Sequence, residues 1–144
     1  MGAYLDLRGW VDLGLPSGKL WCFDNEEGYF TFDEAAEKFQ DQLPTIKDWN
    51  ELIDNTTQRF DKRRKGLVLK APNGKKLFLP AMVGYYTDAN KRGIYSAGNI
   101  GYYWSATPYD ENEARDIMFG HLGVYTIGYD TRSCSFSVRL IKSK

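Results

Sequence analysis

Few residues of this chain could perform covalent catalysis, and they are widely spaced. His121 is the only histidine among the 144 residues, so a Ser-His-Asp or Cys-His apparatus would have to use it. It lies in Phe119-Gly120-His121-Leu122-Gly123, a pattern typical of a turn or a strand end, and no G-x-S-x-G elbow accompanies it. We interpret His121 as a surface or loop residue, expect no catalytic residues and predict that the protein is not an enzyme.

The cysteines and the acidic residues are the other groups that could form a site. Cys22 and Cys134 both lie in strand-like apolar runs, which favours buried free thiols and leaves one disulfide as the alternative. One histidine and two distant cysteines do not form a structural zinc site. The run 110–113 with Asp116 offers the oxygen ligands that calcium prefers, but a solvated acidic loop is favoured. We therefore predict no metal and no cofactor.

Tyrosine is the residue type whose abundance points to a function. Aromatic residues make up 15% of the chain, and ten of them are tyrosines. A tyrosine ring offers a stiff contact area with a polar tip, which suits ligand recognition, although a β-rich fold alone also accounts for many tyrosines. Such rings stack on sugars or fill protein hot spots. Eight of the ten fall in one glycine-rich half of the chain: Tyr85, Tyr86, Tyr95, Tyr102, Tyr103, Tyr109, Tyr125 and Tyr129.

The elements that must position these rings begin with a hairpin and two helices. Turn residues 16–18 between two apolar runs predict a hairpin over 11–23. Thr31 and Thr45 are each followed three residues later by an acidic residue, the pattern of a helix capping box. Apolar stripes at helical spacing follow both caps: Phe32, Ala35, Ala36 and Phe39 in the first helix, and Ile46, Trp49, Leu52 and Ile53 in the second.

Strands dominate the sequence from Gly66 onward. Asn73-Gly74 between apolar runs predicts a second hairpin. Residues 81–107 lack periodicity, which predicts irregular loops closed by a strand over 102–106, and a further strand is expected over 114–119. Cys134 to Leu140 alternates apolar and polar residues, which predicts a last strand with one buried and one wet face. Early helices and later strands indicate one α+β domain over residues 1–144, with two helices packed on an antiparallel sheet.

The overall composition argues against two classes of partner. Nineteen basic and nineteen acidic residues cancel, whereas a general nucleic-acid binder needs a positive surplus. No run of 18 apolar residues occurs, so we expect no membrane insertion. Residues 1–8 lack the basic start and apolar run of a signal peptide.

Five short stretches follow one another in the order of a known family. Residues 11–21 read V-D-L-G-L-P-S-G-K-L-W and residues 43–52 read L-P-T-I-K-D-W-N-E-L. Three more are F-L-P-A at 78–81, G-Y-Y-W-S-A-T at 101–107 and F-S-V-R at 136–139. Together they resemble the Fibrobacter succinogenes major paralogous domain over nearly the whole chain. The family's small-residue stretch after the first motif is replaced here by C-F-D-N, so the loops there are expected to differ.

The resemblance implies a C-type-lectin-like fold, with paired N- and C-terminal strands and long irregular loops at one end. Similar domains occur on bacterial surfaces and in phage receptor-binding proteins, where the binding residues lie between the W-S-x-T motif and the final strand. That region is Pro108 to Ser133 here. With Tyr103 of the preceding strand, the predicted ligand-binding residues are Tyr103, Tyr109, Arg115, His121, Tyr125, Tyr129 and Arg132.

The sequence thus predicts a non-enzymatic binding module that recognises a protein or glycan ligand on a cell surface, as in a phage or bacterial adhesion protein. The alternative is a structural subunit, homo-oligomeric or part of a larger virion or surface assembly. The expected location is the extracellular surface or a virion. Replacing Tyr125 or Arg132 with alanine is expected to weaken binding and to leave thermal stability almost unchanged.

Overall fold

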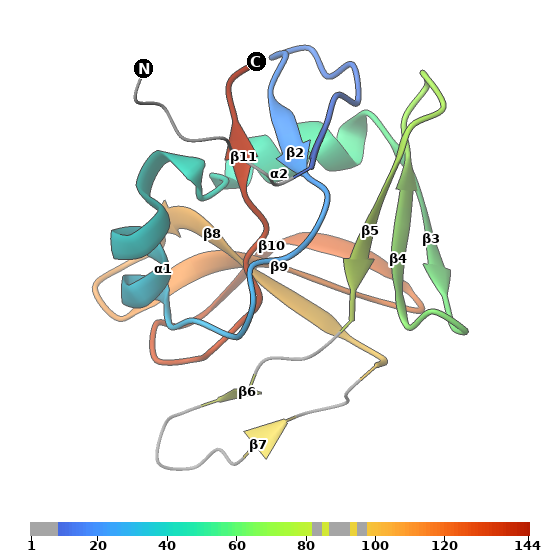
Figure 1. Cartoon of the computed structure of the whole chain (residues 1–144). Helices are drawn as coiled ribbons and strands as arrows, with labels where there is room; N and C mark the ends of the chain where they lie inside the picture. The colour runs from blue at the N-terminus through green and yellow to red at the C-terminus, as the bar shows by residue number, and fades with distance from the viewer. Residues whose placement is uncertain (1–8, 82–84, 87–92, 95–97) are drawn as a thin grey trace.

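The strands of this protein form three small antiparallel sheets around two short helices (Figure 1). The computed structural model describes residues 9–81, 85–86, 93–94 and 98–144. The first sheet has the order β1–β2–β11, and Ile141 lies opposite Trp21 where β11 pairs with β2. Its strands are β1 (Trp10–Val11), β2 (Leu20–Cys22) and β11 (Ile141–Lys142). The expected hairpin over 11–23 is confirmed. The C-terminal strand β11 pairs with β2 and not with the N-terminal strand β1, so the predicted pairing of the two terminal strands is wrong.

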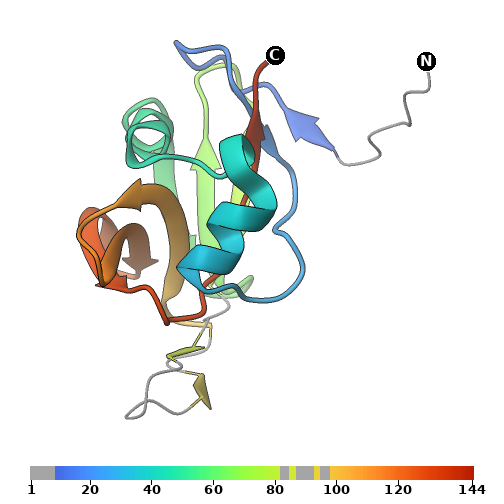
Figure 2. The same cartoon turned by 90° about the vertical axis from the view of Figure 1, so that its left-hand side faces the viewer.

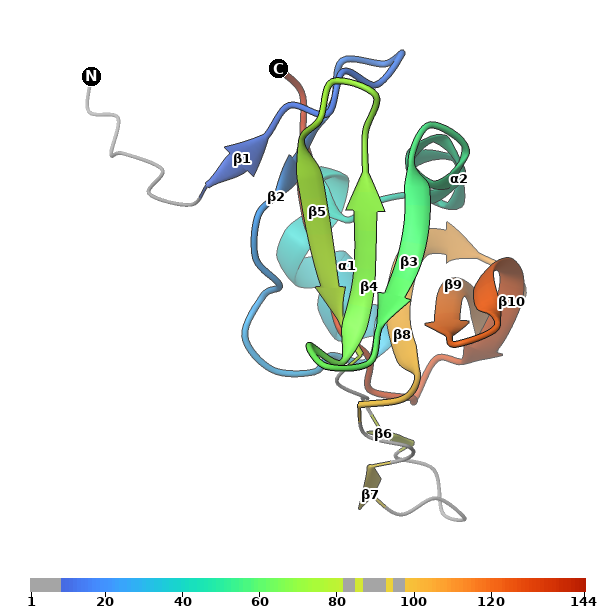
Figure 3. The ribbon, with the colours of Figure 1, turned by 90° about the vertical axis from the view of Figure 1, so that its right-hand side faces the viewer.

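The second sheet, β3–β4–β5, contains the predicted Asn73-Gly74 hairpin. Gly74 has a φ of 89°, the left-handed conformation that this turn requires. Its strands are β3 (Thr57–Asp61), β4 (Gly66–Lys70) and β5 (Lys76–Pro80). The sequence interpretation missed β3, because its T-Q-R-F-D sequence is polar and follows directly after a helix. Figure 3 shows this sheet facing the viewer, between β1 and β2 on one side and strands β9 and β10 on the other.

The third sheet has the order β8–β9–β10; the fourth motif forms β8, and the other two strands lie between the fourth and fifth motifs. Its strands are β8 (Gly101–Pro108), β9 (Glu113–Gly120) and β10 (Gly123–Thr131). The strand expected over 114–119 is part of β9, and β9 and β10 form a hairpin over most of the region 108–133. Short strands β6 (Tyr85–Tyr86) and β7 (Gly93–Ile94) form a separate pair. Tyr95 and the N-terminal residues 1–8 lie outside the described residues.

Both helices begin at the predicted capping boxes. Helix α1 (Phe32–Phe39) has Thr31 as its N-cap, and the Thr31 hydroxyl accepts from the backbone N–H of Glu34. Helix α2 (Ile46–Asp54) has Thr45 as its N-cap in the same arrangement with Asp48. A single 3₁₀ turn, Gln40–Gln42, joins the two helices. In Figure 2, α1 lies beside β2 and β11, with the β9–β10 hairpin on its other side.

The inner faces of the three sheets pack against one another in one central apolar cluster. Residues from every sheet contribute to it, and the Trp49 ring of α2 lies 4.7 Å from the Trp21 ring of β2. A second cluster lies under α1, where the Trp104 ring of β8 packs against Phe136 at 4.6 Å. Burial of these side chains accounts for the stability of strands that are only two to five residues long in the first two sheets.

The predicted C-type-lectin-like arrangement, with two helices packed on one antiparallel sheet, is wrong. The molecule is mostly β and is α+β only in a loose sense, because its strands are divided among three small sheets. The hydrophobic pattern of a hairpin shows which of its faces is buried. It does not show whether neighbouring hairpins join edge to edge or pack face to face, and here they pack face to face.

The predicted last strand over 134–140 is also wrong. Within it, Phe136 forms an isolated bridge with Phe30 and Ser137 forms one with Tyr103. All seven residues are buried, including the polar ones, so no face is wet. The alternation arises because the apolar residues of this segment all belong to the cluster under α1, while Arg139 between them is hydrogen-bonded rather than solvated. Cys22 and Cys134 are buried free thiols, as predicted.

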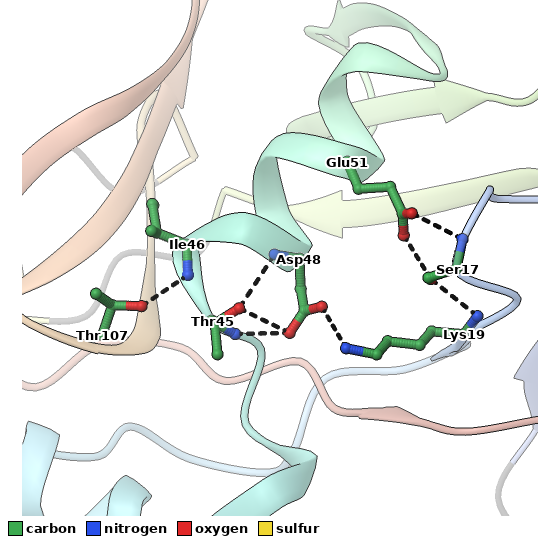
Figure 4. Close-up of polar contacts among 7 residues, drawn as sticks. All are labelled: Ser17, Lys19, Thr45, Ile46, Asp48, Glu51 and Thr107. Atoms are coloured by element: carbon green, nitrogen blue, oxygen red, sulfur yellow. Dashed lines mark hydrogen bonds and ion pairs between the residues drawn. The ribbon is translucent and has the colours of Figure 1, made fainter.

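All five sequence motifs contribute to two polar networks, of which the first surrounds the start of α2 and is partly exposed (Figure 4). Glu51 accepts hydrogen bonds from the backbone N–H and the hydroxyl of Ser17, in the first motif. The Lys19 ammonium lies 2.7 Å from the Asp48 carboxylate, which also accepts from Thr45. Burial raises the pKa of Asp48, but hydrogen bonds from Lys19 and Thr45 outweigh it and hold this pKa below its usual value.

Arg139 of the last motif is the centre of the second network. Its side chain is almost fully buried and donates to the backbone carbonyls of Cys22, Phe23 and Phe78, and to the Asn25 side chain. Phe78 belongs to the third motif. The motifs therefore hold distant parts of the chain together, and they form the base of the β9–β10 hairpin.

Candidate functional site

The exposed aromatic and aliphatic side chains gather on the outer face of the β9–β10 hairpin. Five of the six large hydrophobic residues that are well exposed among the described residues lie on or beside this hairpin. Leu122 and Ile127 are 92% and 78% exposed, and the three tyrosines are 44–47% exposed. We call this surface the hairpin face and define it as Tyr109, Arg115, Met118, Leu122, Tyr125, Ile127 and Tyr129.

Alternation along β10 produces the hairpin face. Tyr125, Ile127 and Tyr129 are exposed, whereas the residues between them are partly buried. The turn is formed by His121 and Leu122, and Gly123 after it has a φ of 137° that favours glycine. Tyr125 lies opposite Met118 and Tyr129 lies opposite Arg115, so β9 contributes to the same face.

An irregularity in the pairing explains why the hairpin face stays continuous. The register shifts between Tyr125 and Gly128. Three steps along β9, from Met118 to Arg115, match four steps along β10, and the two intervening residues of β9, Asp116 and Ile117, are both buried. The extra residue therefore lies on β10, opposite Ile117, and exposed residues still alternate with partly buried ones along this strand.

A stacked pair of tyrosines forms one end of the hairpin face. The Tyr109 and Tyr129 rings lie parallel, with centroids 3.9 Å apart and an interplanar angle of 5°. The Arg115 guanidinium lies 5.5 Å from the Tyr109 ring centroid, and within the described part of the chain it forms no ion pair. The hydrogen bond between the two hydroxyls raises the pKa of Tyr129. These rings are held in place before any ligand arrives.

An apolar groove forms the other end. It has a volume of about 450 Å³ and is lined by Ile100, Met118, Leu122 and Tyr125, with few polar atoms. His121 stands at its margin, exposed, with its ring 4.4 Å from the Phe60 ring of β3. The groove is the size of one or two large side chains, and its lining would bind apolar groups.

A pair of acidic residues lies beneath the hairpin face. Asp116 is 1% exposed, and its Oδ2 atom has no hydrogen-bond partner within the described residues. Burial, together with the hydrogen bond and charge of Asp130, raises the pKa of Asp116 far above its usual value, so this carboxyl is protonated at neutral pH. Gly128 makes room for it, since a Cβ atom there would lie 3.2 Å from Asp116 Oδ1.

Two of the predicted ligand-binding residues are structural instead. Tyr103 is 0% exposed; its hydroxyl donates to the Pro80 carbonyl at 2.9 Å and accepts from Asn25 at 2.8 Å, and burial raises its pKa to about 12. In every tyrosine pair of a strand one ring faces inward, and Tyr103 is that ring here.

Arg132 is the second structural residue. Its guanidinium donates to the backbone carbonyls of Asp110 and Glu113 and lies 4.9 Å from the Phe32 ring of α1. It therefore ties the base of the hairpin to that helix, and replacing it should reduce stability. The remaining predicted residues, Tyr109, Arg115, Tyr125 and Tyr129, lie together on the hairpin face, with His121 at the groove margin.

The acidic run 110–113 forms a turn rather than a cation site. Asp110 Oδ1 accepts from the backbone N–H groups of Asn112 and Glu113, while Asp116 lies buried on the inner side of β9. No three histidine, cysteine or acidic residues gather as metal ligands within the described ranges. Residues 110–112 are exposed, as a solvated loop requires, whereas the buried Asp116 does not fit that interpretation.

Sequence interpretation missed three residues of the hairpin face: Met118, Leu122 and Ile127. The signal for Ile127 was present, because Tyr125-x-Ile127-x-Tyr129 repeats with the period of a strand. It was overlooked because polar and glycine residues between the large ones suggested a loop. Leu122 had no such signal, since an apolar residue at a turn tip is not distinguished by its neighbours.

Comparisons with known proteins give one match. Residues 72–141, from the β4–β5 turn to the start of β11, match the model of a family described as a domain of unknown function (DUF8237). No curated protein and no solved structure matches the chain. Among the described residues, no helix is long and apolar enough to cross a membrane. The matched segment contains the whole third sheet, so the chain's similarity to this family includes the hairpin face.

Proposed function

We propose that this protein is a non-enzymatic binding module whose hairpin face docks onto the surface of another protein. The observation that carries the proposal is the concentration of exposed apolar and aromatic residues on this one hairpin. Single exposed hydrophobic residues are normal on a protein surface, but a contiguous group of them marks an interaction site.

The chemistry of the face favours a protein ligand over a glycan. Sugar recognition needs many hydrogen-bonding side chains around each stacked ring. Here Ile127 and Leu122 are the most exposed residues of the face, and the groove beside them has few polar atoms. Protein hot spots, in contrast, combine aromatic rings, aliphatic side chains and arginine. The matching partner surface is apolar, with a carboxylate placed to pair with Arg115.

The position of the face on regular strands supports the same conclusion. Strands β9 and β10 are eight and nine residues long, the longest in the molecule's described part together with β8. The Tyr109–Tyr129 stack fixes two rings in advance, so little side-chain freedom is lost on docking. A stiff aromatic surface on a rigid base is a common design of protein-binding domains.

We also propose that binding takes place at the outer surface of a cell or on a virion. The support for this is the resemblance of the five ordered motifs to the Fibrobacter succinogenes major paralogous domain. The structural-subunit role remains the alternative function, in which the hairpin face is covered permanently by a neighbouring chain.

The test is a binding screen with matched variants. The wild-type protein is applied to an array of purified cell-surface proteins and, in parallel, to a glycan array. We expect protein signals that fall about tenfold or more in Tyr129→Ala and Arg115→Ala, the size of effect typical of hot-spot residues. Phe23→Ala and Arg59→Ala are the controls, because both side chains are well exposed and lie outside the hairpin face.

Two outcomes would contradict the proposal. Binding to glycans alone would show that the ligand class is wrong. Protein signals that are equal in the wild type and in both hairpin variants would show that the ligand binds elsewhere. Circular dichroism of every variant checks that the fold is intact.

A further inference from the structure

A second, smaller pocket adjoins the apolar groove and has a different chemistry. It has a volume of about 300 Å³ and lies where the β3–β4 turn, residues 98–99 and the β9–β10 turn meet. In Figure 3 the end of β9 lies beside β3, and the His121 ring contacts the Phe60 ring there. Asn99 and His121 line both hollows. We call the second hollow the basic pocket and define it as Phe60, Lys62, Lys65, Gly98, Asn99 and His121.

The two lysines of the basic pocket lie on a turn whose backbone is fixed. Asp61 Oδ1 accepts hydrogen bonds from the backbone N–H groups of Arg63 and Arg64, at 3.0 Å each. Lys65 ends the turn with a φ of 57°, the left-handed conformation. Its side chain runs along Gly98, where a Cβ atom would come within 2.9 Å of Lys65 Cδ. The stem of Lys65 is therefore held against the wall of the pocket.

The positive charge of the basic pocket is not compensated by its lining. Within the described ranges, Lys62 and Lys65 form no ion pair, and no acidic residue lines the pocket. Asp61 is adjacent in the sequence, but its carboxylate accepts from the turn N–H groups and lies 3.8 Å from the Arg59 guanidinium. Two uncompensated ammonium groups at one hollow attract an anion.

The groove and the basic pocket together fit a ligand with two chemically different parts. The groove is lined by Ile100, Met118, Leu122 and Tyr125, and it would bind an apolar group. The basic pocket, which meets the groove at His121, would bind a carboxylate. Neighbouring side chains of an extended peptide point to opposite sides, so a large apolar residue and an acidic residue next to it can enter the two hollows together.

We propose that the groove and the basic pocket bind an extended segment of a partner protein, in which a large apolar residue has an acidic residue beside it. Charge complementarity to Lys62 and Lys65 selects this occupant. The inference rests on the proposed function, because it names the part of the protein ligand that enters one end of the hairpin face. It also adds the β3–β4 turn, a part of the second sheet, to the interface.

An anionic membrane is the other surface that lysines beside an exposed leucine could contact. Stable binding to a bilayer needs several signals together, such as a polybasic cluster and a large inserted apolar face. Here the basic pocket has two lysines, Leu122 is one exposed residue at the turn, and the chain has no net charge. A single acidic segment of a protein matches this small charge better than a membrane does.

A peptide titration of the full chain tests the inference. The probe is acetyl-Gly-Glu-Phe-Glu-Gly-amide, which has a glutamate on each side of the apolar residue. Two related peptides have glutamine in place of both glutamates, or alanine in place of phenylalanine. Amide NMR shifts report affinity and location. We expect a Kd of about 1 mM or tighter for the first peptide, with the largest shifts at residues 98–100 and 118–122.

Both related peptides should bind more weakly. Loss of either the carboxylates or the ring should weaken binding by about fivefold or more, since each removes one of the two contacts. Raising the salt concentration from about 50 mM to about 500 mM should weaken binding of the glutamate peptide and leave the glutamine peptide almost unchanged.

Paired lysine variants locate the charge that the peptide uses. Lys62→Gln/Lys65→Gln should weaken the glutamate peptide by about fivefold or more and leave the glutamine peptide unchanged. Lys75→Gln/Lys76→Gln is the matched control. It removes two charges from exposed lysines at the β4–β5 turn, at the opposite end of the same sheet, and should bind as the wild type does.

Equal affinity for the glutamate and glutamine peptides overturns the inference, and so does the absence of shifts at residues 98–100 and 118–122. Equal weakening by the two double variants also overturns it, because overall charge rather than the basic pocket would then attract the peptide. Vesicles of phosphatidylcholine and phosphatidylserine are sedimented with the chain in parallel. Co-sedimentation that is lost in Lys62→Gln/Lys65→Gln would assign the two hollows to a membrane instead.

The binding screen fails or succeeds separately from this titration. The screen depends on Arg115 and Tyr129, which line neither hollow. A protein ligand that requires these two residues, together with a peptide that does not bind, would refute the inference and leave the proposed function intact. Peptide binding as expected, together with array signals for glycans alone, would refute the proposed function.

Discussion

The polar networks around α2 and Arg139 differ from the β9–β10 hairpin both in residue type and in what their side chains contact. Around α2 and Arg139, charged and polar side chains form hydrogen bonds between segments far apart in the sequence, and Arg139 does so while almost fully buried. On the hairpin, aromatic and aliphatic side chains are turned outward and contact mainly one another. The recognisable motifs thus belong to the part of the molecule that maintains the fold. The β9–β10 hairpin, which contains none of the five motifs, is the part whose outer face is free to bind a ligand.

This division has a physical cause. A residue that satisfies buried carbonyls cannot be exchanged without leaving them unpaired, so its type is fixed by the fold. A side chain on the outer face of a strand has only solvent beside it, so its type is set by what the surface must contact. If this division is correct, substitutions in the networks reduce stability strongly, and substitutions on the hairpin face reduce it little.

The largest effect is expected for Arg139→Met. The substitution keeps much of the buried volume but removes the donors to the carbonyls of Cys22, Phe23 and Phe78. Each unsatisfied buried acceptor costs about 1–3 kcal/mol, so we expect a loss of about 3 kcal/mol or more in urea unfolding. Arg59→Met is the control, because the Arg59 side chain is 68% exposed. Equal stability of the two variants would refute the role of Arg139.

The second prediction concerns pH and Asp116. Its pKa in the folded chain is raised above the ordinary 3.8, so its contribution to stability is complete below about pH 4 and is lost as the pH rises. We expect the free energy of unfolding to fall from pH 5 to pH 9 in the wild type.

Asp116→Asn keeps a donor for Asp130 and removes the titration. It should be more stable than the wild type at pH 8, by about 1 kcal/mol or more, and its profile should be flatter. Asp48→Asn is the opposite case. The pKa of Asp48 is lowered in the folded chain, so the stability that its carboxylate contributes is lost only as the pH falls below about 4. Parallel profiles for wild type and Asp116→Asn would show that Asp116 is ionised.

The third prediction is that Arg132→Ala lowers stability by about 1–2 kcal/mol. The change removes two hydrogen bonds to backbone carbonyls and a cation–π contact with Phe32. Thermal unfolding of the wild type and the variant measures the loss. An unchanged melting temperature would restore Arg132 to the predicted ligand-binding residues.

The smallest effect is expected for Tyr125→Ala. This side chain is half-exposed on the hairpin face, and surface substitutions of this kind change stability by about 0.5 kcal/mol or less. The same urea titration used for Arg139→Met provides the measurement. A loss above about 2 kcal/mol would mean that the hairpin face is part of the core and not a binding surface.

Local elements could be predicted from the sequence because their causes are local. The capping boxes at Thr31 and Thr45 and the Asn73-Gly74 turn depend on residues only a few positions apart, and all three are confirmed. The strands over 102–106 and 114–119 are confirmed within β8 and β9 for the same reason.

What could not be predicted depends on distant contacts. The alternation of 134–140 is the same for a half-exposed strand and for a segment that is buried throughout, and only the packing distinguishes them. The division into three sheets is likewise set by how hairpins meet. At the candidate site, four of the seven predicted residues lie together on the hairpin face, because exposed tyrosines follow the strand period. Tyr103 was misassigned because its inward direction cannot be read from a Tyr-Tyr pair alone.

The buried guanidinium of Arg139 has a consequence for how the chain folds. Its partners Asn25, Cys22 and Phe23 precede it by 114, 117 and 116 residues. Such high contact order means that the hairpins and helices must form first and that the molecule closes late and slowly. Because residue 139 completes this closure, the newly made N-terminal elements wait for it with their apolar surfaces uncovered. The interval before closure is the period in which this protein is most exposed to aggregation and proteolysis.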